Sequence, residues 1–169
     1  MVSELLFLKS INEIFFNIWI IRKGLGMKEH TEMLLQECYS GLYMAVDSMD
    51  QVLPYAKDED LKNLINRYKE KHERLKQQTC EIMCKHNVEQ KKPGMVATAF
   101  AWVTAEAKLM IEDDSNQIAK LMMNGSNMGI QSITECLNKN EEAEEDVRSI
   151  AKKIVRIEEE FLQELKRFL

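Results

Sequence analysis

Histidines and cysteines, which bind transition metals, are few in this chain, and only some of them are spaced so that they could bind one ion together. It contains three histidines, His30, His72 and His86, and four cysteines. Cys80 and Cys84 are four residues apart, which places both thiols on one face of a helix. Together with His86 they form a candidate site for a soft ion such as Cu(I) or Zn(II).

The competing interpretation of this cluster is two thiols that pack near a helix end without binding a metal. Cys80, Cys84 and His86 lack a clear fourth ligand, and His86 lies off the face that the thiols share. Cys38 and Cys136 fall on apolar stripes and are predicted to act as small core residues. Without a C-x-x-C pair or a convincing signal peptide, the cysteines favour reduced thiols in a cytoplasmic protein.

Several chemistries that leave a recognisable motif have no counterpart in the sequence. It contains no P-loop, no Gly-x-Gly-x-x-Gly, no Gly-x-Ser-x-Gly and no His-Glu-x-x-His. Carboxylates are abundant, but they fall on faces predicted to be exposed, so no acid–base pair stands out. The formal net charge of −5 disfavours a nucleic acid as the main partner. The missing motifs and the lack of an acid–base pair argue against an enzyme.

The composition predicts packed helices. The chain has 169 residues with only 6 Gly and 2 Pro, and 11 Met, which suits one helical domain. From residue 27 onward, apolar residues recur at steps of three and four, as on one face of a helix. We expect helices from His30 or Thr31 to a break at Pro54, over 58–86 with Asp58 as N-cap, over 95–112, over 115–137, and from a cap at Asn138 or Asn140 to Phe168.

Residues 1–26 differ from the rest because they hold the densest apolar clusters. Three interpretations remain open. The first is a start codon assigned too far upstream, with the chain beginning at Met27, because Arg22, Lys23 and Gly24 have purine-rich codons like a bacterial ribosome-binding site. The second is a helix that covers the bundle, and the third is a peripheral membrane anchor. The longest uncharged run within residues 1–26, residues 14–21, is too short to span a bilayer.

Two helices, a long connection and two further helices form the layout of a four-helix bundle with one crossover. Residues 29–169 resemble the bacterial ferritin-like families, especially small members of this length. The matching positions are similar to a Trp-x5-Lys crossover and a following helix with an internal Gly-acid pair: Trp102, Lys108, Ile118, Asn124-Gly125-Ser126-Asn127, Glu135 and Leu137. The resemblance implies an all-α, antiparallel four-helix bundle of ferritin-like topology, whose crossover carries an extra helix.

A ferritin-like di-iron centre requires an inward Glu from each of two helices and a Glu-x-x-His pair from each of two others. The residues three positions before the histidines are Met27, Lys69 and Met83, so Glu-x-x-His occurs nowhere. Ser126 stands where the resembled helix carries an acid. A complete di-iron site is therefore not expected.

A partial site for iron or manganese is the alternative, and its candidate ligands are His72, Glu73, Glu106 and Glu158. His72 falls on the inward stripe of its helix, and Glu158 can face inward on the last helix. The competing interpretation is a core histidine held by Tyr68, Thr79 or an acid such as Glu158.

Methionines raise a similar question. Met122, Met123 and Met128 could line a channel for soft metals, but Met at helical spacing more often fills a core, and we favour that interpretation.

We therefore expect two regions, an apolar extension over residues 1–26 and a ferritin-like bundle over 27–169. The expected function is non-catalytic, through self-association or a protein partner, with Phe100, Trp102 and Tyr43 as candidates for an apolar contact outside the core. One alternative is a metal-binding or redox protein with an unorthodox carboxylate/His site. The other is a peripheral membrane protein anchored by residues 1–26.

Overall fold

The computed structural model describes the backbone of residues 2–91 and 115–169, and the side chains of residues 24–91 and 115–169. Four helices make up most of it: α1 (Val2–Val52), α2 (Glu59–Lys85), α4 (Ser115–Lys139) and α5 (Glu145–Leu165). Regular structure in the described residues is helical throughout, which confirms the all-α prediction. The helix expected over 95–112 lies outside the described residues, as do Phe100, Trp102 and Glu106.

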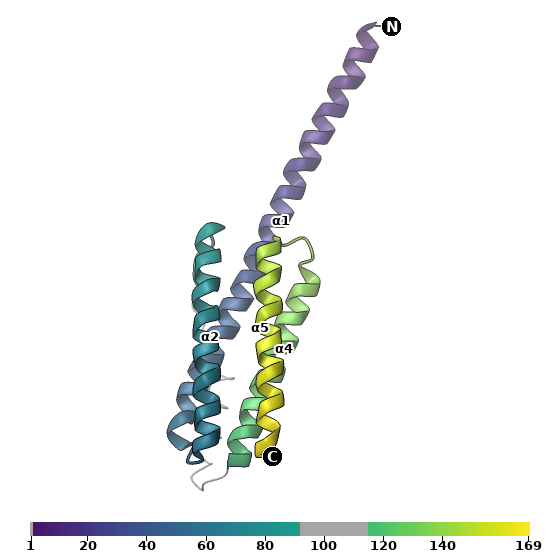
Figure 1. The fold of residues 1–169 in the computed structure, drawn as a ribbon. Helices are drawn as coiled ribbons and strands as arrows, with labels where there is room; N and C mark the ends of the chain where they lie inside the picture. Colours follow the sequence, from purple (N-terminus) through teal and green to yellow (C-terminus); the bar gives the residue numbers. More distant parts are fainter. Residues whose placement is uncertain (1, 92–114) are drawn as a thin grey trace.

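The four helices pack side by side around two apolar clusters (Figure 1). One cluster lies where α1 and α5 end and α2 and α4 begin, and it includes Met49, Leu61, Ile118 and Phe161. The other lies at the opposite end and includes Leu35, Met83, Ile133 and Val147. Between them sit three buried polar side chains, His72, Ser126 and Glu158. The core is therefore two apolar regions separated by a polar layer.

The connection between α1 and α2 follows the predicted chemistry. α1 ends at Val52, and a 3-10 turn, Leu53–Tyr55, contains Pro54; the proline has no N–H to continue the helical ladder. The Asp58 carboxylate then accepts a hydrogen bond from the Leu61 N–H at 2.9 Å. This is the N-cap that satisfies a free backbone donor at the start of α2.

The end of α2 is a Schellman motif that the sequence analysis missed. Asn87 has a φ of 55°, a left-handed conformation that asparagine tolerates better than most residues. The Val88 N–H donates to the Met83 carbonyl at 2.9 Å, and the Asn87 N–H donates to the Cys84 carbonyl at 3.2 Å. Val88 is buried, so the motif also turns an apolar residue into the core.

Two helix starts differ from the predictions. α1 begins at Val2 rather than at His30 or Thr31, because Gly24 and Gly26 lower helix propensity without requiring a break, and neither has a positive φ. Its N-terminal part projects past the end of the bundle instead of covering it (Figure 1). α5 begins at Glu145 and not near Asn140, whose side chain instead donates to the Cys136 carbonyl at 2.7 Å.

The buried face of α4 is also rotated relative to the predicted stripe. Ser126 is buried, whereas Gly125 and Met128 are exposed. The idea of a methionine channel fails at this point, because Met128 is 57% exposed while Met122 is buried in the core. A mixture of Gly, Ser, Asn and Met leaves the apolar direction of this helix poorly defined by sequence alone.

Candidate functional site

The polar layer at the middle of the bundle is built around one hydrogen-bonded pair. His72 Nε2 lies 2.9 Å from Glu158 Oε1, and the two side chains are 0% and 8% exposed. His72 Nδ1 lies 2.7 Å from the Tyr68 carbonyl oxygen. A carbonyl only accepts, so Nδ1 carries a proton and the Nε2 atom faces the carboxyl group. Both ring nitrogens are therefore engaged within the protein.

The environment of His72 stabilises its protonated form. Burial by itself lowers the pKa of His72, but the hydrogen bond and the charge of Glu158, together with the Tyr68 carbonyl, outweigh it. The pKa of His72 is consequently raised above its usual value of 6.5. Partners on α2 and α5 thus favour the charged form of this buried imidazole.

A second network adjoins the pair on the same two helices. The Tyr68 hydroxyl donates to Glu164 Oε1 at 2.7 Å, and Arg67 forms an ion pair with the same carboxylate. The Tyr68 ring stacks on Phe161 at 4.6 Å between centroids, and the Lys71 ammonium lies 4.1 Å from its centroid. Burial and the Glu164 carboxylate raise the pKa of Tyr68. This network locks α2 to α5 and leaves the phenol protonated.

The other predicted metal ligands are not brought to this centre. Glu73 is exposed and lies 3.9 Å from the Lys69 ammonium, and Glu106 is outside the described residues. Across residues 24–91 and 115–169, no three His, Cys, Asp or Glu side chains gather in a way that could hold a metal ion. Two of the three predicted partners of His72 do contact it, Tyr68 through its carbonyl and Glu158 through its carboxylate, whereas Thr79 bonds to the Leu75 carbonyl instead.

A second histidine–carboxylate pair lies at the end of the bundle near the close of α2. His86 Nε2 lies 3.1 Å from both oxygens of Asp146, and Lys85 Nζ lies 2.6 Å from Asp146 Oδ2. Burial would raise the pKa of Asp146, but its interactions with Lys85 and His86 hold that pKa below its usual value. The soft-metal candidate His86 is therefore paired with a carboxylate of α5.

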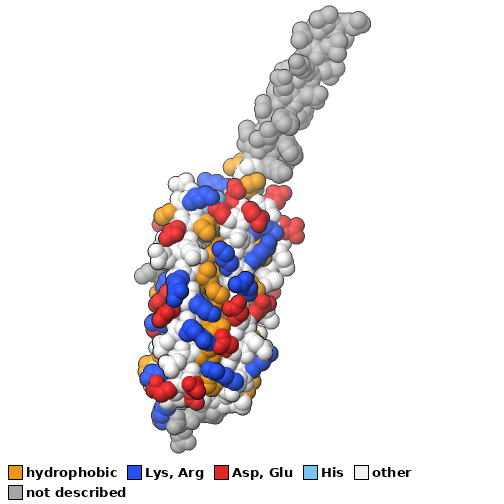
Figure 2. Space-filling view, viewed as in Figure 1, with side chains coloured by type: hydrophobic (Ala, Val, Ile, Leu, Met, Phe, Trp, Pro, Cys, Tyr) orange, Lys and Arg blue, Asp and Glu red, His pale blue; other side chains and the backbone are white. Residues whose placement is uncertain are grey.

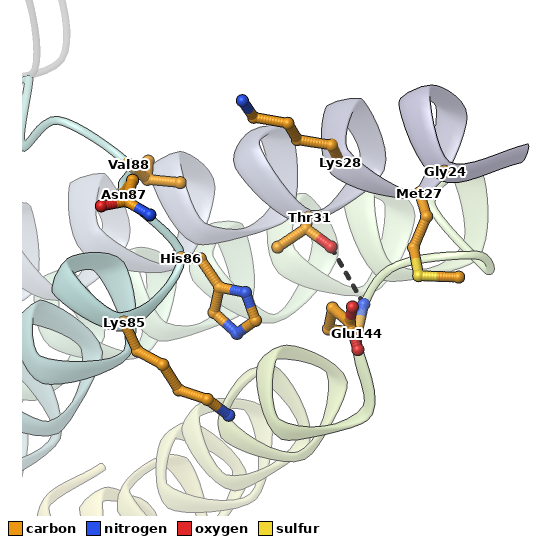
Figure 3. Close-up of a pocket in the computed structure, with 9 residues that line it drawn as sticks. All are labelled: Gly24, Met27, Lys28, Thr31, Lys85, His86, Asn87, Val88 and Glu144. Atoms are coloured by element: carbon orange, nitrogen blue, oxygen red, sulfur yellow. Dashed lines mark hydrogen bonds between the residues drawn. The ribbon is translucent and has the colours of Figure 1, made fainter. Parts of the chain in front are cut away.

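These residues border an open pocket of about 360 Å³ between the start of α5, the turn after α2 and residues 24–31 of α1 (Figure 3). The Thr31 hydroxyl accepts a hydrogen bond from the Glu144 N–H across it at 3.0 Å. Lys28, Lys85 and Glu144 bring charges of both signs to its wall, and Asp146 pairs with Lys85 and His86. The pocket therefore has the character of a helix junction rather than of a charged binding site.

The four cysteines are all unpaired. Burial raises the pKa of Cys38, Cys80 and Cys136, which keeps these thiols protonated and weakly nucleophilic. Cys38 and Cys136 belong to the core or pack against it, as predicted. Cys84 is exposed.

Asp146, Glu164 and Asn140 are partners that sequence reasoning missed. Each lies on a helix or turn that is remote in sequence from its partner, by 60 residues for His86 and Asp146 and by 110 for His30 and Asn140. The spacing of Tyr68 and His72 on α2, and of Glu158 and Phe161 on α5, predicts only which faces of these two helices point inward. It does not identify the partners.

The surface of the bundle and the comparisons with known proteins do not point to a particular ligand or family. Lys, Arg, Asp and Glu intermingle on the face shown in Figure 2, on both sides of a narrow apolar column. Among the described residues, no helix has the length and apolar character needed to cross a bilayer. Comparison with protein-family models, with curated proteins and with solved structures finds no match for this chain.

Proposed function

We propose that this chain is a ferritin-like helical bundle that lacks a complete di-iron site and acts by self-association or by binding a protein partner. The helix order supports the topology. α1 and α5 run from the Leu35 end to the Met49 end, and α2 and α4 run the opposite way. The contacting pairs α1–α2, α4–α5, α1–α4 and α2–α5 are therefore antiparallel, whereas α1 and α5, which also contact each other, are parallel. The end of α2 and the start of α4 lie at opposite ends of the bundle, which is what a ferritin-like crossover requires.

The observation that carries the proposal is the closed pair at the bundle centre. A di-iron centre places its carboxylates and imidazoles there. The described residues contribute one imidazole and one carboxylate, and each already uses the other as its partner at 2.9 Å. Such a pair satisfies two buried polar groups and stabilises a defined helix packing, and both ring nitrogens of the imidazole already have partners.

The net charge of the chain bears on the kind of partner, and its free cysteines bear on the cellular compartment. A net charge of −5 with mixed signs on the surface favours protein over nucleic acid as the partner. The four free cysteines favour a reducing compartment such as the cytoplasm.

The test is elemental analysis and mass determination on the full chain purified from its native host. The proposal expects less than about 0.1 equivalent of iron or manganese per chain after dialysis, and a species larger than the 19.7 kDa monomer. Added Fe(II) or Mn(II) should leave the melting temperature unchanged. Stoichiometric metal that stabilises the fold would overturn the proposal.

A metal-binding or redox role with iron or manganese is the second candidate. One observation favours it: His72 and Glu158, two of the predicted ligands, do converge in the buried centre. It requires further donors, of which Glu106 is the sequence candidate. Under this alternative, His72→Gln should release bound metal while the helical content measured by circular dichroism stays constant.

A further inference from the structure

The N-terminal part of α1 is a helix that projects without a described neighbour. The last ties between α1 and the rest of the bundle at this end are His30 Nδ1 donating to Asn140 Oδ1 at 2.7 Å and Thr31 accepting from Glu144. Beyond them the helical backbone continues back to Val2 and leaves the bundle (Figure 1). At 1.5 Å per residue, residues 2–25 extend about 36 Å. We call residues 2–25 the projecting helix.

The sequence of the projecting helix contains a regular apolar seam. Starting at position 7, apolar residues recur at alternating steps of four and three, the spacing of the a and d positions of a coiled coil. The six residues of this stalk seam are Phe7, Ile11, Ile14, Ile18, Ile21 and Leu25. This spacing is the pattern by which one helix packs along another of similar length. Other apolar residues of the segment, among them Leu6, Phe16 and Trp19, lie off the seam.

The same register continues into the bundle, where it does pack on other helices. Counting on from Leu25 by steps of three and four reaches Lys28 and Glu32, and then five buried residues: Leu35, Tyr39, Leu42, Val46 and Met49. Leu35, Tyr39 and Leu42 belong to one apolar cluster of the bundle and Met49 to the other. Above Lys28 the described part of the chain supplies no such helix, and Leu25 is 65% exposed, the most exposed large apolar residue described.

We infer that the stalk seam is covered by the stalk seam of a second copy of this chain, with the two projecting helices antiparallel. This inference rests on the proposed self-association and names the surface and the partner. Antiparallel pairing in one register places Phe7 opposite Leu25, Ile11 opposite Ile21 and Ile14 opposite Ile18, so all six positions are used. No residue of the seam is left over at either end.

Charge selects the antiparallel orientation. The same register places Glu4, the position before Phe7 in the heptad, opposite Lys28, the position after Leu25. A parallel pair would instead place Glu4 beside Glu4 and Lys28 beside Lys28, which is unfavourable. The antiparallel pair also puts the two bundles at opposite ends of the paired helices, so that they do not compete for the same space.

The test is sedimentation equilibrium of the full chain at micromolar concentration, with two variants that make the same chemical change. The full chain should sediment as a dimer, twice the mass of 19.7 kDa. Ile18→Asp buries a charge in the seam and should weaken dimerisation at least about 100-fold. Ile20→Asp, two residues away and off the seam, is the matched control and should remain a dimer. Circular dichroism should give equal helicity for all three.

The orientation has its own test. Glu4→Lys should weaken the dimer about tenfold by facing Lys28 with a like charge. Adding Lys28→Glu to that variant should restore the affinity. Restoration supports antiparallel pairing, whereas a dimer that Glu4→Lys leaves unchanged, or that the second change does not restore, contradicts it.

The remaining outcomes separate the seam from the proposed function. If Ile18→Asp stays dimeric, the chain associates through another surface, so the seam fails and self-association stands. If the full chain is monomeric at all concentrations, both fail. If it is monomeric and sediments with vesicles of phosphatidylcholine and phosphatidylglycerol, and both aspartate variants reduce that binding equally, the apolar residues serve a lipid surface and the inference is overturned.

Discussion

Two histidine–carboxylate pairs join α2 to α5 in this bundle, and they differ chiefly in depth. His72 and Glu158 lie 2.9 Å apart with side chains 0% and 8% exposed, whereas His86 and Asp146 lie 3.1 Å apart with side chains 17% and 33% exposed. The inner pair sits in the polar layer between two apolar clusters. The outer pair shares its carboxylate with Lys85 beside an open pocket.

The difference shows how burial changes the role of the same chemistry. Removing one partner of a buried pair leaves an uncompensated polar group that water cannot reach, which is strongly destabilising. Removing one partner of a solvated pair leaves a group that water and Lys85 can satisfy, so the effect is small. We therefore expect the inner pair to determine how the helices pack, and the outer pair to adjust the helix junction.

The largest expected effect is that of breaking the inner pair. Glu158→Ala should lower the free energy of unfolding by about 3–5 kcal/mol, because His72 is left buried without its acceptor. Urea denaturation at pH 7 measures it. A loss below about 1 kcal/mol would contradict the account of a buried, mutually dependent pair.

Replacing both partners together sharpens the same point. The double variant His72→Leu with Glu158→Leu should be less destabilised than Glu158→Ala, because apolar residues of similar volume need no partner. A double-mutant cycle on unfolding free energies gives the coupling between the two positions. Additive single losses would show that the side chains act independently.

The pH dependence of stability should carry the signature of His72. Its folded pKa is raised above the unfolded value of about 6.5, so this histidine contributes stability that is fully present below pH 6.5. That contribution is lost as pH rises through the folded pKa of His72. Urea midpoints between pH 5.5 and 9 measure the effect, and His72→Leu with Glu158→Leu should remove it while His86→Ala should leave it in place.

Breaking the outer pair should have a smaller effect on the free energy of unfolding. Its contribution should be lost as pH falls, whereas that of His72 is lost as pH rises. Asp146→Asn should cost about 1 kcal/mol or less at pH 7, since the pair is partly exposed. The pKa of Asp146 is lowered from 3.8, so its contribution exists above pH 3.8 and disappears as pH falls through the folded pKa. Thermal melts between pH 3 and 7 test this, and a larger loss than that of Glu158→Ala would reverse the comparison.

The smallest effect is a gain. Gly125 is exposed within α4, and a Cβ built there meets nothing within 4 Å. Gly125→Ala should raise the free energy of unfolding by about 0.5–1 kcal/mol through helix propensity alone. At Gly129, beside the inner pair, a Cβ would lie 3.7 Å from Glu158 Oε1. Gly129→Ala should be tolerated, and a marked loss there would show that the polar layer has no room for a methyl group.

Local chemistry explains what the sequence could predict. Pro54 and Asp58 act on residues next to them in the chain. The predicted end of α1 and the predicted start of α2 were therefore correct. The inward positions of His72 and Glu158 followed from clean apolar periods on α2 and α5. Their pairing was one of the alternatives, and the structure confirms it.

What could not be predicted depends on long-range contacts or weak patterns. Asn140 resembles an N-cap, but His30, 110 residues away, and the Cys136 carbonyl occupy its side chain instead. The rotation of α4 that exposes Met128 and buries Ser126 has no apolar signal in the sequence. A helix over residues 1–26 was one of three open interpretations, and the apolar residues of that segment did not indicate that it would continue α1 and project beyond the bundle.

The central claim, that the bundle centre is a closed His72–Glu158 pair, is tested most directly by long-range ¹H–¹⁵N NMR of the His72 imidazole at pH 6, with and without one equivalent of Mn(II). The claim predicts protons on both Nδ1 and Nε2, and signals that Mn(II) leaves unchanged. Selective broadening of the His72 signals by Mn(II), relieved by Glu158→Gln, would contradict it.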